Sequence, residues 1–199
     1  MPEVSDQPDL GALIGSRICH DLISPIGAIG NGVELLMMGG SAQGPEMSLI
    51  LESVTHANAR IRFFRVAFGA AGSDQRIGAT EVTSILSDMT RSGRLMVSWQ
   101  SDSDLSRAEV KRAFLVLMCL ETAMPWGGRV TVLHETGLWR IAGQSTRLRI
   151  DPDLWTPLST GATPRTQNPA LVHFLLLAAE AAKRPLQIAT GEETLEIRF

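Results

Sequence analysis

The chain has 199 residues, of which 44% are hydrophobic and 20% are charged, and its net charge is −3. Such a composition is ordinary for a globular protein with a real core, and the length fits one or two domains. A weakly negative chain has no general attraction to phosphate backbones, so we expect no nucleic-acid partner.

Targeting and redox signals are also sparse. The N-terminus is acidic and lacks the basic and apolar regions of an export signal. The longest apolar runs, 113–120 and 173–179, are too short to span a bilayer, so we expect no membrane partner. Cys19 and Cys119 lie far apart, which fits a reduced protein. These features together predict a cytoplasmic protein.

Two long helices are predicted first. From Asp9 to about Met38, apolar residues recur every three or four positions and form one stripe. From Met47 to Phe68 the steps alternate between three and four, as in a coiled-coil seam. The intervening residues Gly39, Gly40, Ser41 and Gly44 predict a short loop, and Pro45 suits a first helical turn.

The two helices should therefore form an antiparallel hairpin. Their apolar positions are Ile14, Ile18, Leu22, Ile26, Ile29, Val33 and Leu36 in the first, and Met47, Ile50, Val54, Ala57, Ile61, Phe64 and Phe68 in the second. Neither helix can cover the other's stripe completely. A second hairpin would cover both, so we expect a four-helix bundle in a homodimer.

The second half has a different pattern. Residues 69–78 read as a linker, which divides the chain into a helical-hairpin domain at 1–72 and an α/β domain at 79–199. Helices are predicted at 80–91, 106–123 and 169–183. Strands are predicted at 95–99, 129–134, 138–142 and 147–150, with a closing hairpin of 186–189 and 195–199 turned at Gly191. With 161–168 as a polar loop, the pattern favours an α+β sandwich with helices on one face of a mixed sheet.

His20 lies on the wrong face of its helix for a core residue. At 100° per residue, with Ile18 as zero, the apolar stripe spans about 0° to 80° and His20 lies near 200°. Ser24, Gly27, Asn31 and Glu34 share its face. We therefore expect the imidazole to point into solvent.

An exposed histidine is commonly just a surface residue, but the neighbours of His20 favour a functional site. Asp21 is adjacent and acidic. Pro25 lies inside the helical run, where it costs about 3 kcal/mol. Gly27, Gly30 and Gly32 lower helix propensity further. So many local costs around one imidazole indicate function.

The segment His20-Asp21-Leu22-Ile23-Ser24-Pro25 resembles the H-box of sensor histidine kinases. The longer run HDLISPIGAIGNGVELL resembles the dimeric histidine phosphotransferases of the ChpT type from alphaproteobacteria, and the resemblance covers nearly the whole chain. It implies that His20 receives a phosphoryl group from the receiver domain of a hybrid histidine kinase. It further implies transfer to CtrA-type response regulators, in a CckA–CtrA-type cell-cycle relay.

The same resemblance suggests that the second half is a degenerate kinase ATPase-like domain. Kinases carry an Asn-Leu-Leu-x-Asn-Ala box where this chain has Met118-Cys119-Leu120-Glu121-Thr122-Ala123, so Thr122 replaces the metal-binding asparagine. AGQSTRLR stands at 142–149 in place of Asp-x-Gly-x-Gly, and neither a glycine-rich lid nor a P-loop is visible. We therefore expect no cofactor of its own, with Mg²⁺ on the partner receiver.

Several residues have predicted roles beside His20. Asp21 would orient the imidazole, and Arg17 would offer charge to phosphoryl oxygens. The receiver would contact Ile23, Ser24, Gly27, Asn31 and Glu34, with Arg60, Arg62, Phe63 and Arg65 of the second helix completing the footprint. Each of these residues also fits an ordinary solvated helix face.

Two rival functions stay open. The chain could be a degenerate kinase homologue that sequesters receivers without being phosphorylated, or an ATP-dependent kinase with an unusual pocket. Other enzyme classes lack support, because there is no Gly-x-Ser-x-Gly motif and the four histidines and two cysteines show no metal-ligand spacing.

Overall fold

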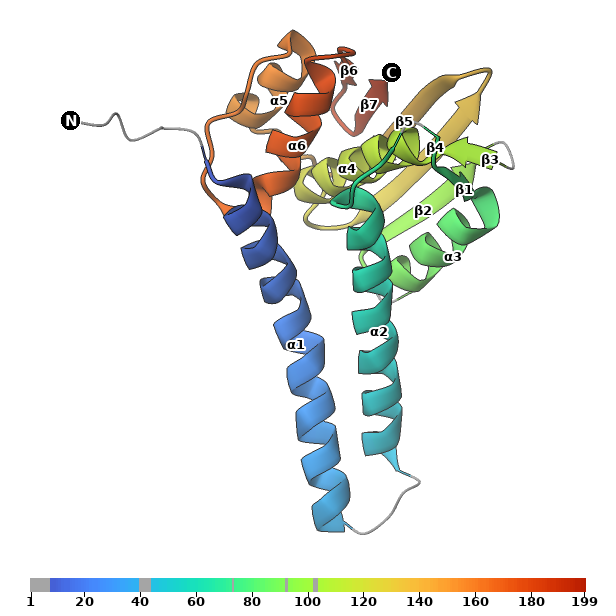
Figure 1. The fold of residues 1–199 in the computed structure, drawn as a ribbon, viewed down its shortest axis with the longest axis vertical. Helices are drawn as coiled ribbons and strands as arrows, with labels where there is room; N and C mark the ends of the chain where they lie inside the picture. Colours follow the sequence, from blue (N-terminus) through green and yellow to red (C-terminus); the bar gives the residue numbers. More distant parts are fainter. Residues whose placement is uncertain (1–7, 40–43, 73, 92, 102–103) are drawn as a thin grey trace, which may run out of the picture.

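The computed structural model describes residues 8–39, 44–72, 74–91, 93–101 and 104–199. Two long helices project from an α/β body that lies at one of their ends (Figure 1). The acidic N-terminal segment and the loop residues Gly40 and Ser41 fall outside the described residues. In the part of the chain that the structure describes, no helix combines the length and apolar character needed to cross a membrane.

The projecting helices are α1 (Leu10–Gly39) and α2 (Pro45–Ala67), and they run antiparallel as predicted. Gly32 is buried where they approach each other closely. A Cβ atom built on Gly32 would lie 2.6 Å from Cγ1 of Ile50. The glycine that weakens the helix locally therefore allows tight packing against α2.

Both helices are anchored to the body. Phe63 of α2 stacks on Phe114 of α4 (Arg107–Ala123), with 4.6 Å between ring centroids. Near the start of α1, a guanidinium N–H of Arg17 donates to the carbonyl of Ala170 at 3.0 Å. Ala170 belongs to the short helix η1 (Pro169–Leu171), which leads into α6 (Val172–Ala181). The hairpin is thus held at two separate points.

The body contains a five-stranded mixed sheet in the order β2-β4-β5-β7-β6. Its strands are β2 (Leu95–Gln100), β4 (Gly128–Glu135), β5 (Leu138–Gln144), β6 (Gln187–Thr190) and β7 (Thr194–Arg198). Only the β2–β4 pair within this sheet is parallel. Alternate residues such as Val130, Val132 and Ile141 are fully buried. They meet the helices, which include α3 (Ala79–Thr90), so the predicted α+β class is confirmed.

Three local predictions differ from the structure. Residues Arg76–Gly78, predicted as linker, form β1 and pair with β3 (Asp104–Ser106). The predicted strand at 147–150 is absent, because the Arg149 N–H bonds instead to the Ala123 carbonyl. The helix α5 (Pro152–Thr160) was not predicted, since its two prolines disguise it. The proposed division into domains stays a prediction.

The close approach at Gly32 gives a test of hairpin packing. Gly32→Ala should lower the free energy of unfolding by about 1–3 kcal/mol, because the new methyl group overpacks the contact with Ile50. Gly27→Ala is the matched control, since nothing lies within 4 Å of its added Cβ. It should gain up to about 1 kcal/mol from helix propensity. Urea unfolding at one protein concentration measures both, and equal stabilisation would contradict the packing argument.

Candidate functional site

His20 stands on the surface of α1. Its side chain is 83% exposed, which confirms the orientation expected from the helical periodicity. Pro25 follows within the same helix, which continues through it without a break. The imidazole is therefore available to a large partner as well as to a small molecule.

Asp21 fixes the orientation of that imidazole. Its carboxylate is 8% exposed, and its Oδ1 lies 3.0 Å from Nδ1 of His20. A carboxylate can only accept hydrogen bonds, so Nδ1 must carry the proton and donate it. In the neutral ring the lone pair is then on Nε2, the nitrogen that is not bonded to Asp21.

The other oxygen of Asp21 holds two arginines from different helices. Oδ2 accepts a hydrogen bond from Arg60 of α2 at 2.9 Å and forms an ion pair with Arg17 of α1 at 3.0 Å. Arg17 is only 17% exposed and also binds the Ala170 carbonyl, so it reaches His20 through Asp21. The pairing of Arg60 with Asp21 was not predicted, because the two residues are separated by 39 positions in the sequence.

A groove of about 460 Å³ lies beside His20 between the two helices. Of the predicted footprint, Ser24 of α1 and Arg60 of α2 line this groove, and Pro25 and Ala28 lie beside Ser24. The rest of the wall formed by α2 was not predicted, since only the helix pairing brings it here: Leu49, Glu52, Ser53 and His56.

The rest of the predicted footprint divides into two groups. Ile23 is 68% exposed, and Gly27, Asn31 and Glu34 are exposed farther along α1. On α2, by contrast, Phe63 is buried in the core. Arg62 and Arg65 are bound to Asp88 and Glu81, respectively. Phe63 therefore cannot contact a receiver, which corrects the suggestion that it completes the footprint.

Thr122, at the position of the kinase asparagine, joins α4 to α6. Its hydroxyl donates to the Met118 carbonyl and lies 3.1 Å from Nε2 of His173. Burial first, and the nearby charge of Arg17 second, lower the pKa of His173 to about 3, so this ring is neutral. Among the described residues, no cluster of three or more His, Cys, Asp or Glu side chains could hold a metal ion.

Comparisons with known proteins identify the family of this chain. Residues 79–194 match the family described as "Histidine phosphotransferase C-terminal domain". The protein phosphotransferase ChpT of Brucella abortus (strain 2308) is 36% identical over 97% of this chain and 96% of its own length. A solved bacterial phosphotransferase is 35% identical, covers 96% of this chain and 95% of its own, and superposes with a TM-score of 0.78. This chain is therefore a phosphotransferase that belongs to the ChpT-type histidine phosphotransferase family.

Proposed function

We propose that this protein is a cytoplasmic phosphorelay intermediate that works as a homodimer. His20 would accept a phosphoryl group from the receiver aspartate of a hybrid histidine kinase and pass it to CtrA-type response regulators. The observation that supports this most directly is the exposed imidazole whose Nδ1 is held by Asp21, which leaves the lone pair of Nε2 free.

The transfer step needs only positioning from this chain. The Nε2 lone pair attacks the phosphorus of an aspartyl phosphate, a P–N bond forms, and the P–O bond breaks to release the aspartate carboxylate. The ring gains positive charge in this step, and the Asp21 carboxylate stabilises that charge through the Nδ1–H hydrogen bond. Reversal with a second receiver completes the relay. Mg²⁺ would belong to the receiver's acidic pocket, and no nucleotide is required of this chain.

Replacement of His20 tests the relay against the sequestering alternative. His20→Ala should abolish phosphoryl passage between two purified receiver domains, because it removes the imidazole that is the proposed nucleophile. Incubation with a phosphorylated receiver, followed by detection of acid-labile phosphate on this chain, measures the first half-reaction. Cys19→Ala, which alters an exposed neighbour, is the control. Relay that persists at the normal rate in His20→Ala would rule out the proposed role.

Asp21 is expected to act as a positioning residue. Asp21→Asn removes the charge that stabilises the ring, and its amide can present an N–H to Nδ1 in place of an acceptor. We expect the transfer rate to fall about tenfold to a hundredfold, in the range of a lost charged hydrogen bond. Rapid-quench transfer from a phosphorylated receiver measures this rate.

A second measurement separates a general disturbance of the fold in Asp21→Asn from a loss of the orientation of the His20 ring. The ¹⁵N chemical shifts of His20 report which ring nitrogen carries the proton, and Asp21→Asn should move population away from the Nδ1–H form. Glu34→Gln, an exposed carboxylate on the same helix, should change neither the rate nor the shifts. An unchanged tautomer in Asp21→Asn would refute the positioning role even if the rate fell.

The receiver is proposed to dock over His20 and the groove beside it. The groove presents Ser24, Ala28 and Leu49, a mixture of small polar and apolar surface suited to a partner helix. Ile23, Gly27, Asn31 and Glu34 continue this surface along α1. Arg17 is excluded from direct contact in this arrangement because Asp21 and Ala170 hold it on the inner side.

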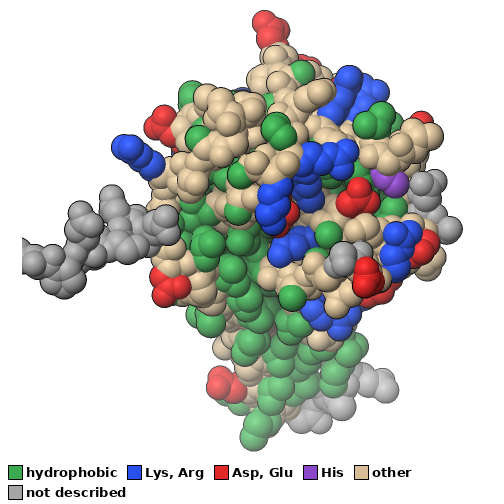
Figure 2. Space-filling model, turned by 45° about the horizontal axis from the view of Figure 1, so that its top comes forward, with side chains coloured by type: hydrophobic (Ala, Val, Ile, Leu, Met, Phe, Trp, Pro, Cys, Tyr) green, Lys and Arg blue, Asp and Glu red, His purple; other side chains and the backbone are tan. Residues whose placement is uncertain are grey.

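A homodimer is proposed because the hairpin leaves apolar side chains uncovered. Ile26, Val33, Val54 and Ile61 are 57%, 43%, 38% and 50% exposed, respectively, and all belong to the predicted stripes. Figure 2 shows hydrophobic side chains gathered along the projecting helices. A soluble chain rarely leaves such a continuous patch open to water. A second hairpin would bury these residues in a four-helix bundle.

One substitution at the centre of this patch tests the dimer. Val54→Glu would place a charge in the buried seam of the bundle and should shift the mass measured by light scattering from two chains toward the 21.5 kDa of one. Leu138→Glu is the control, because Leu138 is 67% exposed but lies on the sheet of the body. A wild-type protein that is monomeric at micromolar concentration would refute the proposal.

A further inference from the structure

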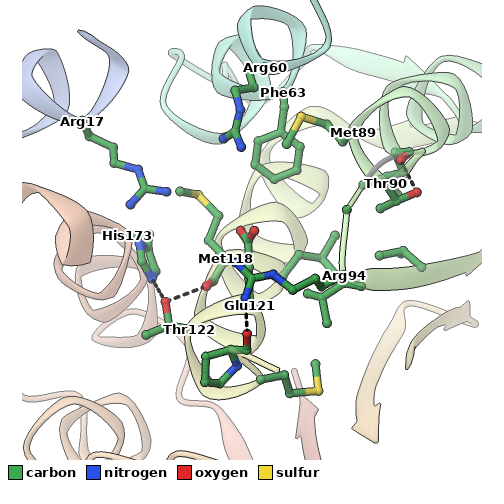
Figure 3. A pocket seen from close by; sticks show the side chains of 17 residues that line it. Arg17, Arg60, Phe63, Met89, Thr90, Arg94, Met118, Glu121, Thr122 and His173 are labelled. Carbon is green, nitrogen blue, oxygen red and sulfur yellow. Dashed lines mark hydrogen bonds between the residues drawn. The ribbon is translucent and has the colours of Figure 1, made fainter. Parts of the chain in front are cut away.

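A second cleft lies between the base of the hairpin and the body, on the inner side of Asp21. Its volume is about 520 Å³, within the range of small-ligand sites. The walls come from α1, α2, α3, α4 and α6 and from the segment that leads into β2. Figure 3 shows the cleft from close by, with Met118 and Glu121 of α4 beneath its open space.

Part of the lining of the cleft is apolar. Phe63, Leu86, Leu117 and Met118 line it, and each is less than 7% exposed. Phe63 presents an aromatic ring, which is held in place by its stack on Phe114. A flat apolar group could therefore lie against this wall and lose its contact with water.

Another part of the lining is cationic. Arg17, Arg60 and Arg94 come from three separate segments of the chain, and Figure 3 shows the guanidinium groups of Arg17 and Arg60 directed toward the open space. Arg94 and Glu121 both line the cleft, and Arg94 donates to the Pro125 carbonyl at 2.9 Å. Three guanidinium charges face one carboxylate inside the cleft, with Asp21 behind Arg17 and Arg60. Glu121 and Asp21 together compensate two of the three guanidinium charges, so one positive charge is left to attract an anionic group.

Two buried polar atoms beside the cleft also lack hydrogen-bond partners. His173 is 1% exposed and lines the cleft, and its Nδ1 has no partner, while its Nε2 is engaged with Thr122. Nε of Arg17 is likewise buried and unpaired. The Thr122 hydroxyl donates to the Met118 carbonyl, so Nε2 of His173 carries the ring proton and the unpaired Nδ1 can only accept a hydrogen bond. Buried polar groups are normally hydrogen-bonded, so the unpaired N–H of Arg17 is the group that can donate to an anionic ligand at this wall.

We propose that this cleft is a binding site for a small organic anion: a phosphate or carboxylate group carried on a flat apolar body. The anionic group would lie among Arg17, Arg60 and Arg94, and the apolar body would lie on Phe63, Leu117 and Met118. Because Arg17 and Arg60 also hold Oδ2 of Asp21, the occupant would contact the same two arginines that support the His20 site. The inference is independent of the phosphorelay role.

Phenyl phosphate is a suitable probe, because it carries both parts of the proposed ligand. Titration calorimetry with the full chain should show saturable binding with one site per chain. Benzoate should also show saturable binding, because its carboxylate can take the place of the phosphate group. Phenol, which lacks the charge, and inorganic phosphate, which lacks the ring, should each bind at least about tenfold more weakly. Equal binding of phenol and phenyl phosphate would refute the role of the arginines.

Two variants with opposite expected effects locate the site. Arg94→Gln should weaken phenyl phosphate binding about tenfold by removing one charged donor. Glu121→Gln should strengthen it by removing the competing carboxylate, an effect that misfolding cannot mimic. Arg91→Gln is the control, since Arg91 is 64% exposed, pairs with Asp88 and lies outside the cleft. No saturable binding, or an affinity unchanged in both cleft variants, would overturn the proposal.

A spectroscopic measurement tests the link to the histidine site. Phenyl phosphate should shift the His20 ring resonances in proportion to occupancy, because the ligand and Asp21 share Arg17 and Arg60. The shift should weaken in parallel with affinity in Arg94→Gln. Binding that leaves the His20 resonances unmoved would show that the ligand does not engage the two shared arginines and would overturn the proposed placement of its anionic group.

Discussion

The carboxylate of Asp21 accepts hydrogen bonds from His20 and Arg60 and forms an ion pair with Arg17, and most of the site geometry depends on it. Its Oδ1 holds Nδ1 of His20, and its Oδ2 holds Arg17 and Arg60. Arg60 belongs to the other helix of the hairpin, and Arg17 continues to a carbonyl of the body. A mostly buried carboxylate is costly unless it is well paired, and here the pairing also compensates two guanidinium charges that would otherwise repel each other. The same group therefore orients the imidazole and joins three parts of the fold.

Local patterns in the sequence were sufficient to predict the two helices of the hairpin and the exposure of His20. A regular repeat of apolar residues determines which face of a helix is buried, and this face can be identified without knowledge of the rest of the chain. The contact of Arg60 with Asp21 is different, because it depends on how α2 is aligned along α1. The close approach of the helices at Gly32 depends on the same alignment. No pattern within either helix specifies this register.

The body shows a similar contrast. The alternation of apolar residues at 129–134 and 138–142 predicted β4 and β5 correctly, since both strands have one buried and one exposed face. The three-residue strands β1 and β3 are too short to carry a pattern, and they exist only through their mutual pairing. In α5, Pro157 interrupts the sequence pattern that would predict a helix. The helix nevertheless ends in a common way, with Gly161 in the left-handed conformation.

The exposure of His20 bears on how long a phosphoryl group could persist on its imidazole. A phosphoryl group attached to a side chain that is 83% exposed is surrounded by water, and the P–N bond is reactive toward water as well as toward carboxylates. Among the described residues, none closes over the imidazole, whose side chain is 83% exposed. In the proposed relay, a phosphoryl group on His20 would therefore be suited to brief occupancy, and its lifetime in water would limit how long the chain can wait for the next receiver. Rapid encounter with an acceptor protein would then favour delivery of the phosphoryl group over its loss to water.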